Sequence, residues 1–113
     1  MADKVLIWLG TSRAEVRAFP EAVRRVAGFE LRQVQHGLGP SDWKPMRTVG
    51  PGVIELRLHA AGEYRVLYVA KFSEAVYVLH AFEKRTRRTP GVAIDLARSR
   101  LQQLQQARKR REE

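Results

Sequence analysis

The sequence predicts an α+β fold in which three strands form an antiparallel meander, with a strand and two helices before it and one helix after it. Residues 53–59 alternate apolar and charged side chains, which is typical of a half-buried strand. Two further apolar runs follow it, each after a short turn-forming segment. The segments that begin at Pro20 and Pro90 carry apolar side chains at helical spacing instead.

The chain begins with a predicted strand and two helices. Residues 5–9 form a short apolar run that indicates a strand. Ser12 and Glu15 have the spacing of a capping box, so a short helix is expected to begin there. A second helix is expected over residues 20–35, because Pro is favoured in a first helical turn and Gly37 suits a left-handed cap.

The three strands of the meander are predicted at 53–59, 63–72 and 75–82, joined by tight turns. In the first strand, Glu55 and Arg57 fall on the face opposite its apolar residues. The third strand is almost continuously apolar, which indicates a central position in the sheet.

Two segments outside the meander are predicted to be less regular. Residues 37–52 are rich in Gly and Pro and indicate a long loop, whose length suggests either a functional role or packing by its own Trp43 and Met46. The last helix should begin at Pro90. Its end, about residues 106–113, has lost the apolar stripe and is expected to fray.

Length and composition limit the class of protein. The 113 residues, 44% of them apolar, suit one modest core, so a single domain over 1–113 is expected. No apolar run approaches the ~20 residues that span a bilayer, and the N-terminal stretch lacks a signal peptide's length and cleavage site. A cytoplasmic protein is therefore expected. The absence of cysteine excludes disulfides, thiolate nucleophiles and zinc–cysteine sites.

The chain is strongly basic. Lys and Arg number 21 against 12 Asp and Glu, which gives a formal net charge of +9, and most of the cations are Arg. Guanidinium groups bind phosphate through paired N–H donors and stack on bases, so nucleic acid is the leading partner, ahead of an acidic protein and a membrane surface. The Arg-rich proteome of a GC-rich genome would give the same charge, and charge alone does not separate these interpretations.

Five segments, taken in order and spacing, carry a family resemblance over nearly the whole chain. They are DWKPM (42–46), GVIELRL (52–58), EYRVLYVAKF (63–72), VYVLHAFEKRTRRTP (76–90) and DLARSR (95–100). Together they resemble the RelE/ParE toxin superfamily, in detail its HigB-like branch, which is related to the phage protein Gp49. The resemblance implies a RelE-like fold: a curved antiparallel sheet of the N-terminal strand and the meander, with helices packed on one face.

The resemblance also implies a function and its partners. Proteins of this kind are the toxins of type II toxin–antitoxin modules. RelE and HigB relatives bind in the ribosomal A site and cleave messenger RNA with no metal or other cofactor, which inhibits translation. The implied partners are the ribosome, mRNA and a cognate antitoxin, a helix-turn-helix protein of the HigA type, through which alone the toxin would reach operator DNA. No membrane partner is implied.

Arg65 and Arg57 are the first candidate catalytic residues. RNA supplies its own nucleophile, the 2′-hydroxyl, so Arg and Lys need only position the phosphate and stabilise its extra charge. Arg65 aligns with the strand arginine that RelE-type toxins place against the scissile phosphate, and Arg57 with a basic residue on the preceding strand. The competing interpretation of Arg65 is an exposed arginine paired with Glu55 or Glu63. Glu55 departs from RelE, which has lysine there, and it could be a structural ion-pair partner. Whether Arg57 and Arg65 share a face depends on the hairpin register.

A basic run follows the third strand. Lys84 and Arg85 align with the position at which relatives have a catalytic or phosphate-binding basic residue. The competing interpretation is that the basic run is simply exposed to solvent and has no specific role. Arg87 and Arg88, and Lys44 in the preceding loop, are candidate RNA-binding residues that would contact the backbone without specifying sequence.

The remaining candidates are aromatic or titratable. His80 is the candidate for general acid–base catalysis, although a histidine in a central strand is more commonly a core residue. Tyr68 and Tyr77 are expected in the core, because an apolar strand normally buries its tyrosines. Trp43 is expected to anchor its loop in preference to stacking on a base.

Two other functions remain open from the sequence. A ParE-like inhibitor of gyrase would keep the fold and act through a protein surface, without a catalytic cleft. A non-catalytic, basic nucleic-acid-binding protein of phage origin is favoured by Glu55 and by the lack of a clear acid–base residue. The basic run and Arg65 favour the RNA-cleaving toxin modestly.

Overall fold

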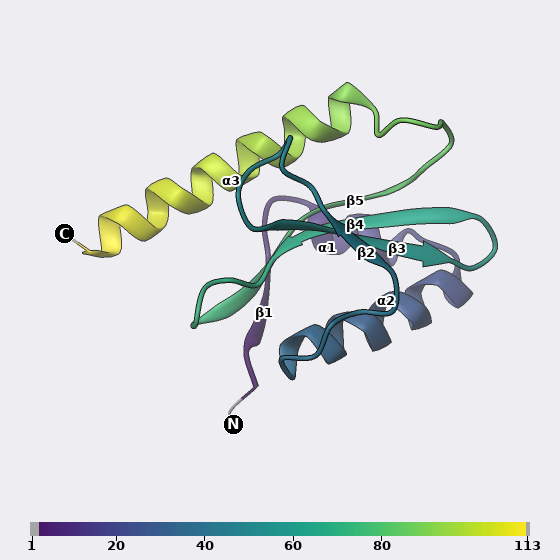
Figure 1. The fold of residues 1–113 in the computed structure, drawn as a ribbon, viewed down its shortest axis with the longest axis horizontal. Helices are drawn as coiled ribbons and strands as arrows, with labels where there is room; N and C mark the ends of the chain where they lie inside the picture. Colours follow the sequence, from purple (N-terminus) through teal and green to yellow (C-terminus); the bar gives the residue numbers. More distant parts are fainter. Residues whose placement is uncertain (1–2, 113) are drawn as a thin grey trace.

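The computed structural model describes residues 3–112, which form a five-stranded mixed sheet with helices on both faces (Figure 1). The strands are β1 (Val5–Trp8), β2 (Trp43–Pro45), β3 (Val53–His59), β4 (Glu63–Val69) and β5 (Ala75–Glu83). The helices are α1 (Ser12–Arg17), α2 (Glu21–Gln35) and α3 (Gly91–Glu112). The α+β class and the order of helices around the meander agree with the prediction.

The sheet has the order β1-β5-β4-β3-β2, so β5 is central, as predicted. Strands β3, β4 and β5 form the predicted antiparallel meander. The sheet is not wholly antiparallel, however, because β1 pairs with β5 in parallel. Strand β4 also ends at Val69 instead of continuing to residue 72.

Strand β2 forms within the segment that was predicted to be a loop. It pairs antiparallel to β3, with Lys44 opposite Glu55. The backbone on either side continues the pairing: the Arg57 N–H donates to the Asp42 carbonyl, and the Met46 N–H donates to the Val53 carbonyl. Met46 is buried against the sheet and holds this edge in place, as its predicted packing role requires.

Each face of the sheet has its own core. Apolar residues of α1 and α2, such as Val23 and Leu31, pack on Leu56 and Leu58 of β3. Helix α3 covers the opposite face, where Leu101 and its neighbours meet β4 and β5. Figure 1 shows the sheet between α2 and α3. The expectation that all helices pack on one face is therefore wrong. The apolar stripe of α3 is buried against the face of the sheet that α1 and α2 leave uncovered.

The ends of the first two helices test the predicted caps. The capping box is wrong: Ser12 lies inside α1 and donates to the Val78 carbonyl, while Thr11 holds the N-cap position. The Glu15 carboxylate instead contacts His80 and Arg100. Gly37 is left-handed, with φ +85°, and the Leu38 N–H donates to the Gln33 carbonyl, so the predicted cap of α2 is confirmed.

Helix α3 continues to Glu112, through the segment where fraying was expected. Arg108 accounts for the order, because its guanidinium lies 3.7 Å from the Phe72 ring centroid and pairs with Glu74 on the β4–β5 turn. Glu113 of the predicted tail lies outside the described residues. Across the described helices, none combines the length and apolar character needed to span a membrane.

Candidate nucleic-acid interface

Arg57 and Arg65 face each other across the β3–β4 ladder, so they share one face of the sheet. It is the face that α3 covers, because the side chains alternate with those of Val53 and Leu67, which pack in the α3 core. The hairpin register left open by the sequence is thereby settled. Glu55 stands two residues before Arg57 and lies on this face as well.

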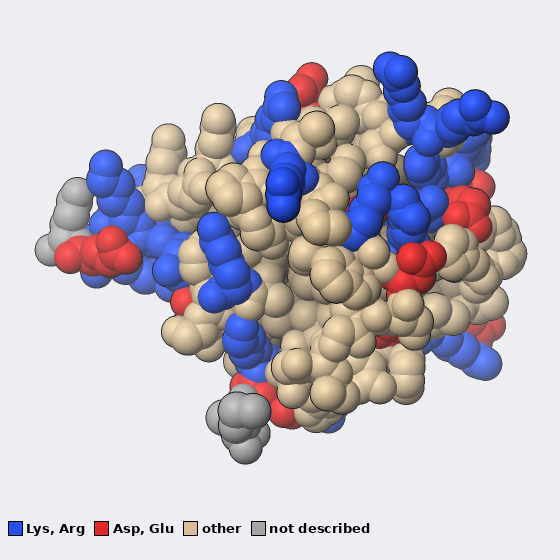
Figure 2. Space-filling model, in the orientation of Figure 1, with Lys and Arg blue, Asp and Glu red and all other residues tan. Residues whose placement is uncertain are grey.

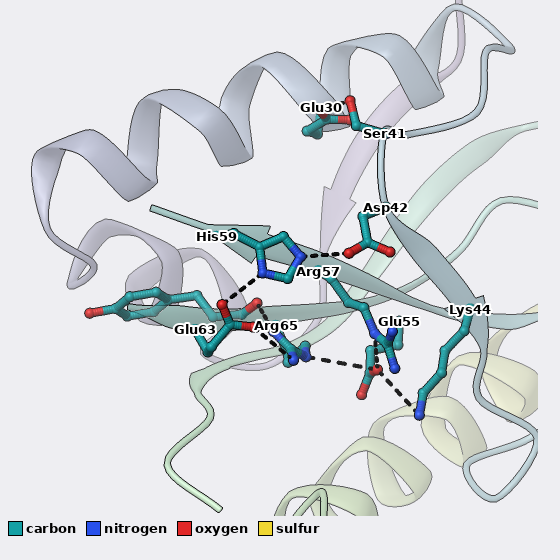
Figure 3. Close-up of polar contacts among 10 residues, drawn as sticks. Glu30, Ser41, Asp42, Lys44, Glu55, Arg57, His59, Glu63 and Arg65 are labelled. Atoms are coloured by element: carbon teal, nitrogen blue, oxygen red, sulfur yellow. Dashed lines mark hydrogen bonds and ion pairs between the residues drawn. The ribbon is translucent and has the colours of Figure 1, made fainter. Parts of the chain in front are cut away.

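Glu55 is fully buried at the centre of a cationic cluster (Figure 3). Its Oε1 lies 3.3 Å from Arg57 Nε, 3.8 Å from Lys44 Nζ and 3.8 Å from Arg65 Nε. Thr89 Oγ1, from the segment between β5 and α3, donates to Glu55 Oε2 at 3.2 Å. One carboxylate therefore neutralises part of the charge of three cations, one of which, Arg65, also pairs with Glu63.

Arg65 is held more tightly than Arg57. Its Nη1 and Nη2 each donate to Glu63 Oε1 at 3.2 Å, and Nη1 also donates to the Tyr64 carbonyl at 2.9 Å. The Arg65 side chain is only 6% exposed, whereas 30% of the Arg57 side chain is exposed. Arg65 pairs with both Glu55 and Glu63, as the competing interpretation expects. Its side chain is buried, however, where that interpretation expects an exposed arginine.

The cluster extends to His59 at the end of β3 (Figure 3). His59 Nδ1 lies 2.7 Å from Glu63 Oε2, and Nε2 lies 2.5 Å from Asp42 Oδ2. The hydrogen bond to Glu63, and then that to Asp42, raises the pKa of His59 above its ordinary value. The hydrogen bond from His59 lowers the pKa of each carboxyl in turn. No local pattern indicates this triad, because Asp42 lies 17 residues before His59 in the chain.

A basic groove of about 640 Å³ lies beside this cluster. Its lining combines five cationic side chains with five others: Lys44, Arg47, Lys84, Arg87, Arg88, Pro45, Met46, Thr48, Thr89 and Ile94. No Asp or Glu belongs to that lining within the described chain. Figure 2 shows Lys and Arg gathered over the segment between β5 and α3, at the upper right. A surface of this kind attracts and binds a phosphate backbone.

The groove and the Glu55 cluster are joined. Thr89 lines the groove and donates to Glu55, and Lys44 belongs to both. The Lys84 N–H donates to the Glu63 carbonyl, which fixes the start of the basic segment beside β4. The structure therefore brings Lys44, Lys84, Arg87 and Arg88 together next to Arg57. Arg47 also lines the groove, although it was not among the candidates named from the sequence. Its position depends on the pairing of β2 with β3, which was not predicted from the sequence.

Arg85 lies apart from these residues. Its side chain is 81% exposed, and its Nε and Nη2 donate to Glu83 Oε1 at 3.0 and 2.9 Å. It is not among the residues that line the groove. Arg85 lies beyond the end of β5 and pairs with Glu83 outside the groove, so its predicted catalytic role has no support from its position.

His80 belongs to a second polar cluster, which joins α1, β5 and α3. Its Nδ1 lies 2.8 Å from Glu15 Oε1, and Arg100 donates to both Glu15 oxygens at 3.1 Å. Arg100 also donates to the Leu79 carbonyl and to Thr11. Since His80 is largely buried and does not line the groove, its position favours the core interpretation over acid–base catalysis.

Glu15 should make the fold sensitive to acid. Burial raises its pKa, but hydrogen bonds from Arg100, His80 and other donors outweigh this and lower the pKa from 4.5 to about 2. A carboxyl with a lowered pKa stabilises the fold above its unfolded pKa and loses that contribution as pH falls through the folded pKa. We expect about 3 kcal/mol of the unfolding free energy to be lost between about pH 5 and pH 2.

Urea unfolding across this pH range measures the effect. Glu15→Gln should lower the unfolding free energy at pH 7 and flatten its decline in acid. Glu21→Gln is the matched control, since Glu21 pairs only with Arg25 on the exposed surface of α2 and should change stability by less than about 1 kcal/mol. Equal acid sensitivity in wild type and Glu15→Gln would contradict the assignment.

The aromatic residues divide between core and surface. Tyr68 and Tyr77 are buried, as predicted, and burial together with the nearby Glu30 charge raises the pKa of Tyr68 to about 12. Trp43 is 46% exposed and borders a hollow that residues 37–40 also line, so it is only partly buried against its own loop. Met46 and Val49 are the buried residues of this stretch.

Comparison with known proteins adds one finding. Residues 14–102 match the family model described as "Phage derived protein Gp49-like (DUF891)". The matched stretch runs from α1 into α3 and includes β2 to β5, hence the Glu55 cluster, the basic groove and Glu15, His80 and Arg100 of the second cluster. A search of curated proteins gives no match.

Proposed function

The chain belongs to the Gp49-like family of phage-derived proteins, within the RelE-related toxin–antitoxin group, and on this basis we propose that it is a HigB-like toxin that cleaves messenger RNA at the ribosome. The reaction is proposed to need no metal, and the protein is proposed to act in the cytoplasm. A cognate antitoxin, proposed to be a helix-turn-helix protein, would be its second partner.

The basic groove beside the Arg57–Arg65 pair is the observation that supports this proposal most. Five cations line the groove without an acidic neighbour among the described lining residues. A single-stranded backbone lying there would place a phosphate near Arg57, the more exposed of the two strand arginines. Inhibition of gyrase through a protein surface would not require such a concentration of cations at one groove.

The chemistry follows from the substrate. The 2′-oxygen of a ribose attacks the adjacent phosphorus, a new P–O bond forms, and the bond to the 5′-oxygen of the next nucleotide breaks. The 2′-hydroxyl loses a proton and the leaving 5′-oxygen gains one. Cationic donors stabilise the extra negative charge on the phosphate during this step, and alignment of the strand on the ribosome supplies positioning.

Arg57 and Arg65 have different roles in this proposal. Arg57 and Lys44 are partly exposed, so an incoming phosphate can compete with Glu55 for them. Arg65 stays bound to Glu63 and the Tyr64 carbonyl and keeps Glu55 in place. Arg57 is then the residue that touches the phosphate, and Arg65 positions the cluster.

Mapping of mRNA 5′ ends after induced expression tests the function. Wild-type protein should arrest growth and create new 5′ ends within translated messages. Co-expression of the neighbouring helix-turn-helix protein should restore growth. Growth arrest with DNA damage and intact mRNA would show a gyrase inhibitor instead, and normal growth would show a non-catalytic binding protein.

Binding to RNA should depend steeply on salt. Each phosphate contact releases counterions, and for single strands the slope of log K against log salt changes by about 0.7 per contact. Lys84→Ala combined with Arg88→Ala should therefore weaken binding and make the slope shallower by about 1.4. Arg24→Ala with Arg25→Ala on the exposed face of α2 is the charge-matched control. A slope near zero in wild type would indicate a protein target.

A further inference from the structure

Trp43 presents a large apolar surface to solvent at the edge of the sheet. Strand β2 is the last strand of the sheet, and its alternation sends Lys44 to the α3 face and Trp43 to the other. Nearly half of the Trp43 side chain is exposed. A single exposed aromatic residue is common on protein surfaces, but one that borders an apolar hollow is a candidate binding site.

The indole borders an apolar hollow of about 580 Å³. The other lining residues are Pro45, Arg47, Pro51, Gly52, Val53 and Ile54. Trp43 and the two prolines supply flat, rigid walls, and Gly52, with φ +80°, adds no side chain. The hollow therefore suits a flat aromatic group more than a branched aliphatic chain.

This hollow is continuous with the basic groove. Pro45 and Arg47 line both, so the two surfaces meet around the edge of β2. A ligand that extends across this edge meets cations on one side and an indole on the other. Strand β2 is only three residues long and contains a proline, which lacks the N–H that an added strand would need. The edge is thus poorly suited to a peptide that binds by extending the sheet.

We propose that Trp43 forms a nucleobase-binding subsite, in which a base of single-stranded RNA stacks on the indole while a flanking phosphate lies on Arg47 and the strand continues around the edge of β2 toward Lys44 in the basic groove. A nucleotide carries both parts that the surface requires, a flat π-face and an attached negative charge. An apolar protein segment would fill the hollow and leave the cations unmatched. The inference rests on the proposed function and adds to it a residue that holds a base next to the site of cleavage.

Binding of two RNA analogues tests the subsite separately from the groove. The probes are a short 2′-O-methyl oligonucleotide, which cannot be cleaved, and a strand of equal length that has phosphates but no bases. Stacking on an aromatic side chain strengthens binding by about five- to a hundredfold per base. Wild-type protein should therefore bind the base-bearing strand about tenfold more tightly than the abasic strand at low salt.

Three variants complete the test. Trp43→Ala should bind both strands with the affinity that wild type has for the abasic strand, and Trp43→Phe should keep most of the difference. Phe29→Ala removes an exposed aromatic side chain from α2 and should change neither affinity. Circular dichroism confirms that each variant is folded.

The outcomes distinguish the two proposals. If Trp43→Ala keeps the full preference for the base-bearing strand, the subsite is overturned and the RNA-binding groove stands. If Trp43→Ala leaves RNA binding unchanged and weakens binding of the antitoxin, the hollow is a protein-docking surface. If wild type binds neither strand, on or off the ribosome, both the groove and the subsite are overturned.

Discussion

Arg57→Ala is expected to lower the rate of mRNA cleavage by about a hundredfold while the protein remains folded, because one donor to a developing oxyanion contributes on this scale. Arg57 is 30% exposed and shares Glu55 with Lys44 and Thr89, which line the groove, so its guanidinium is accessible to a phosphate bound there. Its loss leaves Glu55 paired with Lys44, Arg65 and Thr89, which limits the effect on stability. Cleavage by the purified protein in a translating extract measures the rate.

Arg85→Ala is the informative control for Arg57→Ala. It removes the same charge from an exposed arginine whose partner is Glu83 and which lies off the groove. We expect cleavage by Arg85→Ala to stay within about twofold of wild type, since a surface pair of this kind contributes little. Comparable losses in both variants would mean that only total charge matters, and would contradict a specific role for Arg57.

Arg65→Ala is a poorer test of catalysis, although Arg65 is the residue that the family resemblance singles out. Its side chain is almost fully buried and makes its hydrogen bonds to Glu63 and Tyr64. Removal would leave Glu55 with weaker partners inside the protein, and loss of toxicity could then reflect unfolding. Arg57 separates the two effects because it is accessible.

Glu55→Gln is expected to lower the free energy of unfolding by about 3 kcal/mol, since removal of one partner from a buried cluster of ion pairs weakens the compensation of the charge that stays buried. Lys44 and Arg57 can turn toward solvent when the carboxylate is lost, whereas Arg65, whose side chain is only 6% exposed, stays buried with Glu63 as its remaining carboxylate and loses the charge beside its Nε. Urea unfolding monitored by circular dichroism measures the change.

Glu83→Gln is the matched control for Glu55→Gln. Glu83 is partly exposed and pairs with Arg85 at the surface, so its replacement should cost less than about 1 kcal/mol. A loss of stability in Glu55→Gln no larger than in Glu83→Gln would show that the buried cluster tolerates the missing charge.

Local patterns predicted the meander well, but they left open whether Arg57 and Arg65 share a face, which the register of the structure decides. Side chains along a strand alternate between its two faces, and the short turn at residues 60–62 limits the possible hairpin registers. Strands that are neighbours in the chain can therefore be predicted from sequence. The helix over residues 20–35 could also be predicted, because its apolar stripe and its Gly37 cap are local sequence patterns.

The features that were missed depend on residues far apart in the chain. Strand β2 forms only because β3 offers an edge to it, and Gly and Pro conceal it within a loop-like segment. Glu15 looked like a capping residue, yet Arg100 binds it from 85 residues away. The positions of Arg47 and Trp43 also depend on the pairing of β2 with β3. Burial of Glu55 among three cations has no local signature at all.

The parallel pairing of β1 with β5 bears on how the chain folds during its synthesis. Val5 pairs with Ala75, so the first strand finds its neighbour only after most of the polypeptide has left the ribosome. Contacts of such high sequence separation slow folding, because loop-closure entropy must be overcome before they form. Nascent chains that stop before residue 75 would leave an N-terminal segment unpaired and prone to aggregate. The basic segment 84–90 emerges later still, so the basic groove can form only near the completion of each chain.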